Sequence, residues 1–236
     1  MTDPLVFSPR RHRYSLALRR LPASTRTIAD VGGYRSRAEF VGDYVKGAQY
    51  TAINVGPAWY GDGDFDIAIE GVDVPLPDSS FDAAICVDTI EHVRPEDRRQ
   101  LIKEVCRISR HYSAIVVPFC GDRSPDEETV LLQLTRAGGI ADMPSLAEHL
   151  QHGLPTLEEL RDCANEFGLA IEPATNRALY WAGQWAMAIN QLALGSGAES
   201  ANRAVLEWQE HYLARLPDPV TFDRAYRAVL YSLDAR

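Results

Sequence analysis

The stretch VPLPDSSFDAAICVDTIEHV, residues 74–93, decides which fold this sequence can adopt. Its centre, residues 81–87 (FDAAICV), is short and nearly apolar throughout. Runs of this kind are typical of strands that are covered on both faces of a sheet. Polar and titratable residues follow at once, among them Asp88, Glu91 and His92. We therefore predict a buried strand with functional side chains beyond its carboxyl end.

Four more runs of the same kind predict neighbours for this strand. They are residues 27–31 (TIADV), 50–55 (YTAINV), 66–69 (DIAI) and 113–117 (SAIVV). Residues 95–110 fit a helix, because they begin with Pro and carry apolar residues at helical spacing. Alternating strands and helices imply parallel strands with right-handed crossovers. We predict an α/β fold, a Rossmann-like and mostly parallel central sheet flanked by helices.

The second half of the sequence has a different character. Residues 126–136 and 157–167 are predicted as helices, and residues 169–171 as a sixth strand. Apolar residues then recur every three to four positions in three segments, residues 181–192, 206–216 and 222–233. This period is that of an amphipathic helix, so we expect a helical C-terminal extension rather than more sheet.

The composition disfavours several classes of partner. The 236 residues carry a formal net charge of -9, whereas a protein that grips a phosphate backbone needs a basic surface, so we expect no nucleic acid. No run approaches the roughly 20 apolar residues of a membrane span, and the N-terminus lacks a signal-peptide pattern. We therefore expect no membrane partner and a cytoplasmic location. The basic segment 10–20 is interpreted as a solvated face.

The cysteines and histidines do not form a recognisable metal-binding pattern. The four cysteines, at positions 86, 106, 120 and 163, show no paired spacing, which indicates free thiols. His149 and His152 are three residues apart, not the four of a zinc-binding H-E-x-x-H helix. We therefore expect no metal site.

A glycine pair follows the first predicted strand, in the order Asp30, Val31, Gly32, Gly33. Ligands of an open parallel sheet bind beyond the carboxyl ends of its strands. Glycines let the backbone approach a ligand closely, and the next helix N-terminus offers free N–H groups. A plain tight turn explains such a pair equally well, so the pair alone identifies no ligand.

Two further blocks are much more specific. VPLPDSSFD (residues 74–82) and VDTIEHV (residues 87–93) closely resemble the central motifs of class I S-adenosylmethionine-dependent methyltransferases, of the type 11 kind. The family pattern reads approximately LPFPDxSFD, a strand, and then xxVLEHV. The resemblance runs from about residue 27 through the fifth strand. It implies an enzyme that uses S-adenosyl-L-methionine and releases S-adenosyl-L-homocysteine.

The resemblance also implies which positions contact the cofactor. The glycine loop passes beneath the methionine part, and the end of the second strand meets the ribose. The segment after the third strand contacts the adenine, and the end of the fourth strand lies near the sulfur. The implied residues are, in that order, Asp30, Gly32 and Gly33; Asn54 and Val55; Glu70, Gly71 and Val72; Val87 and Asp88.

Two positions depart from the family pattern. The first loop reads GGYRSR, without the third glycine common in the family. Asn54 stands where the family usually has an acidic residue that binds both ribose hydroxyls, and an amide cannot act as a bidentate carboxylate acceptor. Both changes would weaken cofactor binding. The loop also lacks the G-x-G-x-x-G pattern, which argues against a nicotinamide cofactor.

Histidines are the candidate bases, because methyl transfer to a hydroxyl needs a proton acceptor with a pKa near neutrality. His149 and His152 follow the fifth strand, where class I enzymes commonly place substrate-covering elements, although helix-end histidines are also common without a function. His92 belongs to the family's Glu-His pair, for which a cofactor-side contact and a structural role are both open. Residues 148–160 (EHLQHGLPTLEEL) resemble bacterial methyltransferases that act on sugars or secondary-metabolite scaffolds.

These features predict a single methyltransferase domain over residues 1–236. We expect an N-terminal helix in residues 1–26 and the cofactor-binding core in 27–120. A helical lid or acceptor-side insertion is expected in 121–156, and the last strand or strands and the C-terminal helices in 157–236.

The predicted function is O-methylation of a small-molecule or glycan acceptor in secondary metabolism. Two alternatives are a non-methylating enzyme that binds the same cofactor, and a binding or regulatory module whose pocket has degenerated. The amphipathic C-terminal helices either cap the core or build a homodimer.

Overall fold

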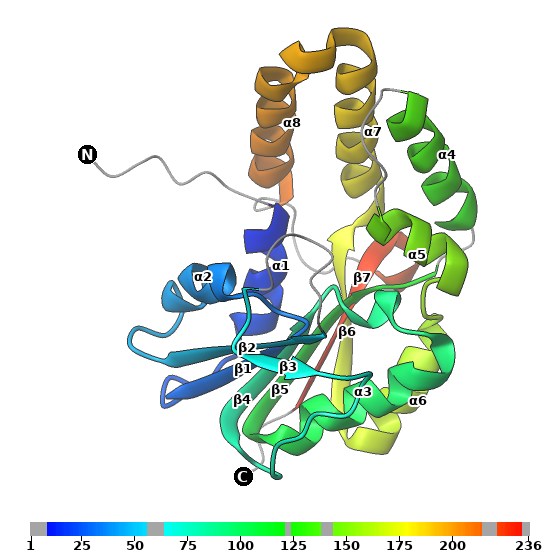
Figure 1. The fold of residues 1–236 in the computed structure, drawn as a ribbon. Helices are drawn as coiled ribbons and strands as arrows, with labels where there is room; N and C mark the ends of the chain where they lie inside the picture. Colours follow the sequence, from blue (N-terminus) through cyan, green and yellow to red (C-terminus); the bar gives the residue numbers. More distant parts are fainter. Residues whose placement is uncertain (1–8, 56–63, 121–123, 138–143, 214–220, 233–236) are drawn as a thin grey trace.

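The computed structural model describes residues 9–55, 64–120, 124–137, 144–213 and 221–232. Within them, seven strands form one sheet in the order β3-β2-β1-β4-β5-β7-β6, with helices packed on both faces (Figure 1). This arrangement confirms the predicted Rossmann-like α/β fold.

The five predicted core strands are present and parallel. They are β1 (Thr27–Val31), β2 (Gln49–Val55), β3 (Ile67–Ile69), β4 (Phe81–Val87) and β5 (Ser109–Pro118). β1 lies between β2 and β4, β3 pairs with β2, and β5 pairs with β4. Residues 83–86 of β4 are fully buried, since helices cover the sheet on both sides. Because the five strands are parallel, their carboxyl ends meet at one edge of the sheet.

The other end of the sheet is antiparallel and corrects one prediction. β6 (Leu169–Asn176) confirms the sixth strand, but β7 (Ala225–Ser232) forms where we expected a helix. β7 lies between β5 and β6 and runs antiparallel to both. Residues 225–230 are all buried, and nearly all of them are apolar because neighbours cover both faces of the strand. An apolar run of this kind also contains residues at helical spacing, so the pattern misidentified it.

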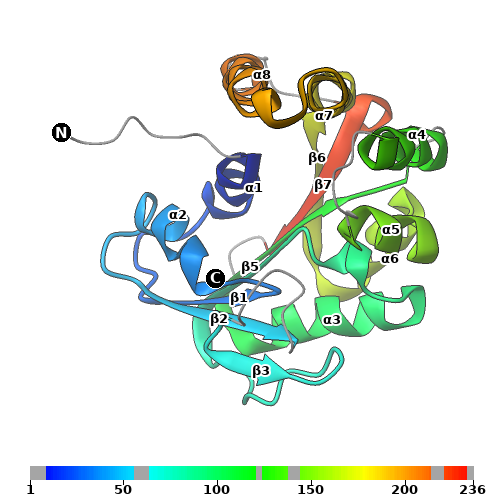
Figure 2. The same ribbon diagram turned by 45° about the horizontal axis from the view of Figure 1, so that its top comes forward.

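Two pairs of helices cover the two faces of the parallel strands (Figure 2). α1 (Pro9–Leu18) and α2 (Ala38–Gly42) share one apolar core with β1, β4 and β5. α3 (Pro95–Ile108) and α6 (Leu157–Phe167) share a second core with the opposite face of the same strands. The predicted helices at residues 95–110 and 157–167 are thereby confirmed.

The remaining helices gather beyond the carboxyl ends of β5 and β6 (Figure 1). α4 (Ser124–Ala137) and α5 (Pro144–His152) follow β5, whereas α7 (Arg177–Leu194) and α8 (Ala198–Leu213) follow β6. This is the edge at which ligands bind in open parallel sheets. The described part of the chain also contains four short 3₁₀ helices, η1 (Arg35–Arg37), η2 (Ile90–His92), η3 (Gly195–Gly197) and η4 (Phe222–Arg224).

Two smaller observations concern the described residues as a set. None of the described helices is long and apolar enough to span a bilayer. The four cysteines are free thiols, as their spacing predicted.

Helix α6 begins with a capping box. The Thr156 hydroxyl accepts a hydrogen bond from the Glu159 N–H (3.1 Å), and the Glu159 carboxylate accepts one from the Thr156 N–H (2.5 Å). These bonds satisfy two of the donors that a helix N-terminus otherwise leaves open. The cap thus fixes where the segment after α5 turns into α6.

We expect Thr156→Ala to lower the free energy of unfolding by about 1 kcal/mol, because it removes the cap acceptor. Thr156→Ser retains a hydroxyl at the same position and should restore most of the loss. Denaturant unfolding of the three proteins measures the effect. A loss in Thr156→Ser equal to that in Thr156→Ala would contradict the assignment.

Candidate functional site

The glycine turn after β1 is held by close contacts that require glycine. Gly32 has a φ of +86°, and a side-chain carbon there would lie 2.1 Å from the Thr89 hydroxyl oxygen. A side-chain carbon on Gly33 would lie 2.3 Å from the Asp30 carboxylate. The Gly32 N–H also donates to the Ile53 carbonyl oxygen at 2.7 Å. The turn therefore joins the ends of β1 and β2 to the loop after β4.

Asp30 is buried beneath this turn. The hydroxyls of Tyr14 and Tyr50 both donate to its Oδ2 at 2.5 Å, whereas Oδ1 is buried and has no hydrogen-bond partner within the described residues. Burial raises the pKa of the Asp30 carboxyl to about 6, and the two hydroxyls only partly offset this rise. The sequence identified Asp30 as the end of a strand but missed both tyrosines, because they come from α1 and β2.

Asn54 ends β2 and faces the glycine turn. Its amide nitrogen donates to the Gly33 carbonyl oxygen at 3.1 Å, and the residue is buried. One side of Asn54 therefore supports the turn itself, a contact that a carboxylate could not make because it has no donor. The side chain of Val55 and residues 56–63 lie outside the described residues.

The segment after β3 lies next in line along the same edge. β3 pairs in parallel with the end of β2, so Glu70, Gly71 and Val72 follow the strand end beside Asn54. Glu70 and Gly71 are exposed, while Val72 packs on the apolar core. The structure thus brings these three residues to the same edge as the glycine turn, and their contacts with an adenine remain a prediction.

Asp88 lies at the carboxyl end of β4, directly after Val87, in a buried ion-pair cluster. Arg227 of β7 binds it through two hydrogen bonds, Nε to Oδ1 at 3.0 Å and NH2 to Oδ2 at 2.8 Å. Arg13 of α1 pairs with Oδ2 as well. Burial raises the pKa of Asp88, but the two guanidinium groups outweigh it and hold this pKa well below its ordinary value. Asp88 is therefore a carboxylate at every physiological pH.

The ion pair was not foreseen from the sequence. The interpretation of residues 10–20 as a solvated face is wrong for Arg13, whose partner Asp88 has a side chain that is only 10% exposed. It is also wrong for His12, whose ring nitrogen lies 3.5 Å from the Thr175 hydroxyl. Arg227 lies in residues 222–233, which we expected to form an amphipathic C-terminal helix. The one indication of a buried charge in the sequence is that Arg227 stands within the otherwise apolar run of β7.

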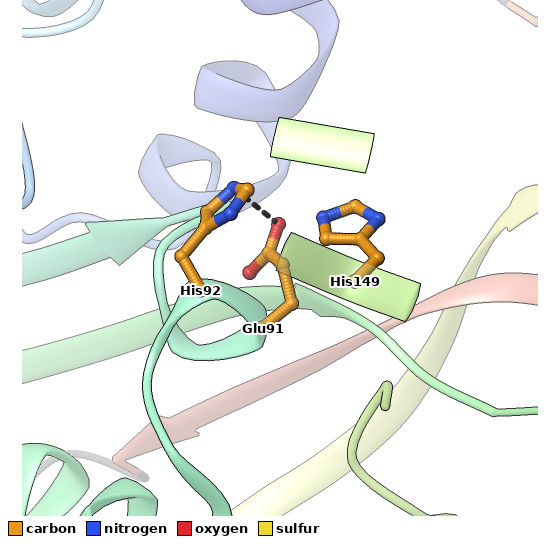
Figure 3. Close-up of side chains that lie close together, drawn as sticks. All are labelled: Glu91, His92 and His149. Carbon is orange, nitrogen blue, oxygen red and sulfur yellow. Dashed lines mark ion pairs between the residues drawn. The ribbon is translucent and has the colours of Figure 1, made fainter. Parts of the chain in front are cut away.

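Glu91, His92 and His149 converge beyond the end of β4 (Figure 3). Glu91 and His92 belong to η2 and His149 to α5. The His92 and His149 rings have centroids 4.9 Å apart, and the Glu91 carboxylate points toward the space between them. Glu91 Oε1 lies 3.8 Å from His92 Nε2. We call these three residues the η2–α5 cluster.

Carboxylates from the covering helices contact the far sides of both rings. Glu128 Oε1 of α4 is hydrogen-bonded to His149 Nδ1 at 3.2 Å, and Glu148 Oε2 of α5 lies 2.9 Å from His92 Nδ1. Burial and the nearby His149 lower the pKa of His92 to about 4, so its imidazole is neutral at pH 7. Burial raises the pKa of Glu91 well above its ordinary value.

His152 is not part of this cluster. It lies at the end of α5, where its backbone carbonyl and that of Gly153 accept hydrogen bonds from Arg98. Of the three candidate catalytic histidines, the structure therefore brings together His92 and His149. The sequence could not select this pair, because the two residues come from distant segments.

The buried Asp30 carboxyl gives the fold a specific pH dependence. Its pKa of about 6 lies above the value near 3.9 of an unfolded chain, so the folded state binds the extra proton between these limits. Asp30 therefore adds stability at low pH, and this contribution is lost as pH rises through 6. We expect the free energy of unfolding of the wild type to fall by about 3 kcal/mol between pH 3 and pH 7.5 relative to that of Asp30→Asn.

Denaturant unfolding across this pH range measures the difference between the two proteins. Asp162→Asn, on the exposed side of α6, controls for the loss of a surface carboxylate. A difference between wild type and Asp30→Asn that is independent of pH would contradict the burial argument.

Comparisons with known proteins agree with this geometry. Residues 43–117 match the model of the methyltransferase domain family. No curated protein matches the sequence. A phosphoethanolamine N-methyltransferase 2 from Haemonchus contortus, solved with phosphomonomethylethanolamine and S-adenosylhomocysteine, has a similar fold, with a TM-score of 0.56 and 14% identity. The match covers 95% of this chain but only 53% of that protein, so the chain spans about half its length.

Two further solved structures share the fold. Geranyl diphosphate methyltransferase in complex with S-adenosylmethionine has a TM-score of 0.56 at 12% identity, over 94% of this chain and 84% of its own. The [4+2]-cyclase SpnF has a TM-score of 0.53 at 18% identity, over 94% of this chain and 79% of its own. At such identities the likeness shows the fold alone. The domain match over residues 43–117 and the strand order together show that the chain is similar to the methyltransferase domain family and shares its Rossmann-like fold.

Proposed function

We propose that the chain binds S-adenosylmethionine and transfers its methyl group to an oxygen atom of a small-molecule or glycan acceptor. The observation that carries the proposal is the contact between the glycine turn and the loop after β4. Gly32 packs directly on Thr89, three residues before His92. The family's cofactor passes over this turn, so the contact supports a reacting centre beside the η2–α5 cluster.

The proposed cofactor site follows the carboxyl edge of the sheet from β1 to β4. Asp30, Gly32 and Gly33 would hold the methionine part, with the unpartnered Oδ1 of Asp30 facing the cofactor's ammonium group. A buried carboxylate oxygen without a partner is costly, and a cationic ligand would satisfy it. Asn54 and Val55 would meet the ribose, Glu70, Gly71 and Val72 the adenine, and Val87 and Asp88 the region of the sulfur.

The transfer itself is an in-line displacement. The acceptor oxygen forms a bond to the methyl carbon while the carbon–sulfur bond breaks, and its electron pair returns to sulfur to give S-adenosylhomocysteine. The protein must align the acceptor and remove its hydroxyl proton. The neutral imidazole of His92 suits this second task, since it can offer a nitrogen lone pair, and His149 lies beside it. His152 lies outside this cluster and is the weaker candidate.

The acceptor side is proposed to be the space beneath α4 and α5, the expected lid. Support comes from the fact that both helices contribute to the η2–α5 cluster, α5 through His149 and α4 through Glu128. Cover of this kind excludes water from a reacting centre. A role in secondary metabolism, a cytoplasmic location and a homodimer stay predictions from the sequence.

A binding module with a degenerated pocket is the second candidate. One observation favours it, namely that Asn54 replaces the usual acidic residue and uses its amide nitrogen to hold Gly33. A non-methylating enzyme with the same cofactor is a third. A test of cofactor binding separates the binding module from the two enzymes. Product analysis then separates the methyltransferase from the non-methylating enzyme.

Isothermal titration with S-adenosylhomocysteine tests the cofactor site. We expect saturable binding to the wild type and about tenfold weaker binding to Glu70→Ala, because a charged hydrogen-bond acceptor is lost at the adenine. Glu158→Ala, which removes an exposed carboxylate from α6, should bind as the wild type does. No binding at millimolar ligand would exclude both enzyme functions, and an unchanged Glu70→Ala would refute the adenine assignment.

Release of S-adenosylhomocysteine in the presence of sugar, polyketide and phosphorylated hydroxyl acceptors tests the transfer. Once an acceptor is found, His92→Ala and His149→Ala should each lower turnover by roughly 100-fold or more, with cofactor affinity unchanged. His111→Ala, which removes an exposed histidine at the start of β5, is the matched control. Full turnover in both cluster variants would rule out proton removal by this cluster.

A further inference from the structure

We propose that Glu91, His92 and His149, the η2–α5 cluster, form a binding site for one divalent metal ion of the zinc type. One ligand atom from each residue can be chosen so that all three lie within 4.8 Å of one another. In a tetrahedral zinc site, with metal–ligand distances near 2.1 Å, ligand atoms lie about 3.4 Å apart. Small side-chain rotations would therefore bring the three ligand atoms to the spacing that one zinc ion requires.

The unsatisfied atoms of the cluster point to a missing partner. Glu91 is 1% exposed, and its Oε2 has no hydrogen-bond partner among the described residues. The Nε2 atom of His149 is likewise buried and without a hydrogen bond in that part of the chain. Buried polar atoms without partners are rare and cost free energy, and both of these belong to the same small cluster. A bound cation would satisfy them together.

The contact behind the His149 imidazole matches that of a metal-bound histidine. A histidine that binds a metal usually gives its other ring nitrogen to a carboxylate or carbonyl, which fixes the ring and its tautomer. Glu128 makes this contact with His149 Nδ1 at 3.2 Å. Glu148 Oε2 lies 2.9 Å from His92 Nδ1 but forms no hydrogen bond with it, so only His149 has the contact in full. Because a carboxylate only accepts, this hydrogen bond places a proton on Nδ1 of His149 and leaves Nε2 as the ring atom that would bind a metal.

The ligand types select the kind of metal. Two imidazoles and one carboxylate suit zinc and similar transition metals, whereas magnesium and calcium prefer oxygen ligands throughout. Three protein ligands leave a fourth position open, as in catalytic rather than structural zinc sites. The site departs from the expectation of no metal, which considered the spacing of the cysteines and of His149 and His152. His149 lies instead beside His92 of η2.

The role of the ion rests on the proposed function, whereas its binding does not. An acceptor hydroxyl at the open position would have its pKa lowered by the ion, and its proton would pass to solvent before the oxygen attacks the methyl carbon. His92 and His149 would then act as ligands, not as bases.

Titration of the metal-free chain with Zn²⁺, and with Co²⁺ as a spectroscopic probe, tests binding without any acceptor. We expect one ion per chain, with visible Co²⁺ bands and no thiolate charge-transfer band. Glu91→Gln and His149→Ala should weaken binding by roughly 100-fold or more, and Glu128→Gln by about 10-fold to 100-fold. His111→Ala controls for exposed histidines and should bind as the wild type does.

Absence of saturable binding, or binding that Glu91→Gln and His149→Ala leave unchanged, would overturn the proposal. Glu91→Gln keeps the size and shape of the buried side chain, and circular dichroism verifies that each variant is folded. Failure of the proposed function gives a different result, namely zinc binding without any binding of S-adenosylhomocysteine. Once an acceptor is known, chelation should abolish turnover and Zn²⁺ should restore it. Turnover that survives chelation would assign His92 or His149 as a free base instead.

Discussion

The buried pair of Asp88 and Arg227 is the interaction on which the arrangement of the site depends. It joins the end of β4 to β7 across the end of β5, and Arg13 adds α1 to the same carboxylate. Removing one partner from such a pair leaves an uncompensated buried charge, which costs roughly 3–5 kcal/mol. The pair therefore fixes the parallel and antiparallel parts of the sheet relative to each other at the edge where the ligand residues end.

Every element of the proposed site is attached to this edge. The glycine turn rests on Thr89, one residue after Asp88, and Asn54 holds the turn from β2. The η2–α5 cluster begins two residues beyond Thr89 and is completed from α4 and α5. In the proposed site the parallel sheet would supply the cofactor side, and the helices after β5 would supply the other side. The division into a cofactor-binding core and a lid stays a prediction.

The sequence predicted the parallel core well, because strands covered on both faces have distinct apolar runs that end in polar loops. The same reasoning failed for β7, whose apolar residues also fall at helical spacing. It selected Asp30, Asn54 and Asp88 by their place at or just after the carboxyl ends of strands, but not what their side chains contact. Tyr14, Arg227 and Glu128 come from distant segments, and no local pattern reveals a partner of that kind. The pairing of His149 with His92 is hidden for the same reason.

A crystal structure of the chain with S-adenosylhomocysteine and Zn²⁺ tests the central claim most directly. The homocysteine part should lie over Gly32 and Gly33 and the adenine beside Glu70, with the sulfur facing Asp88 and an ion held by the η2–α5 cluster. Cofactor bound with its sulfur turned away from His92 and His149 would contradict methyl transfer at this site. Cofactor bound anywhere else on the chain would contradict the whole assignment.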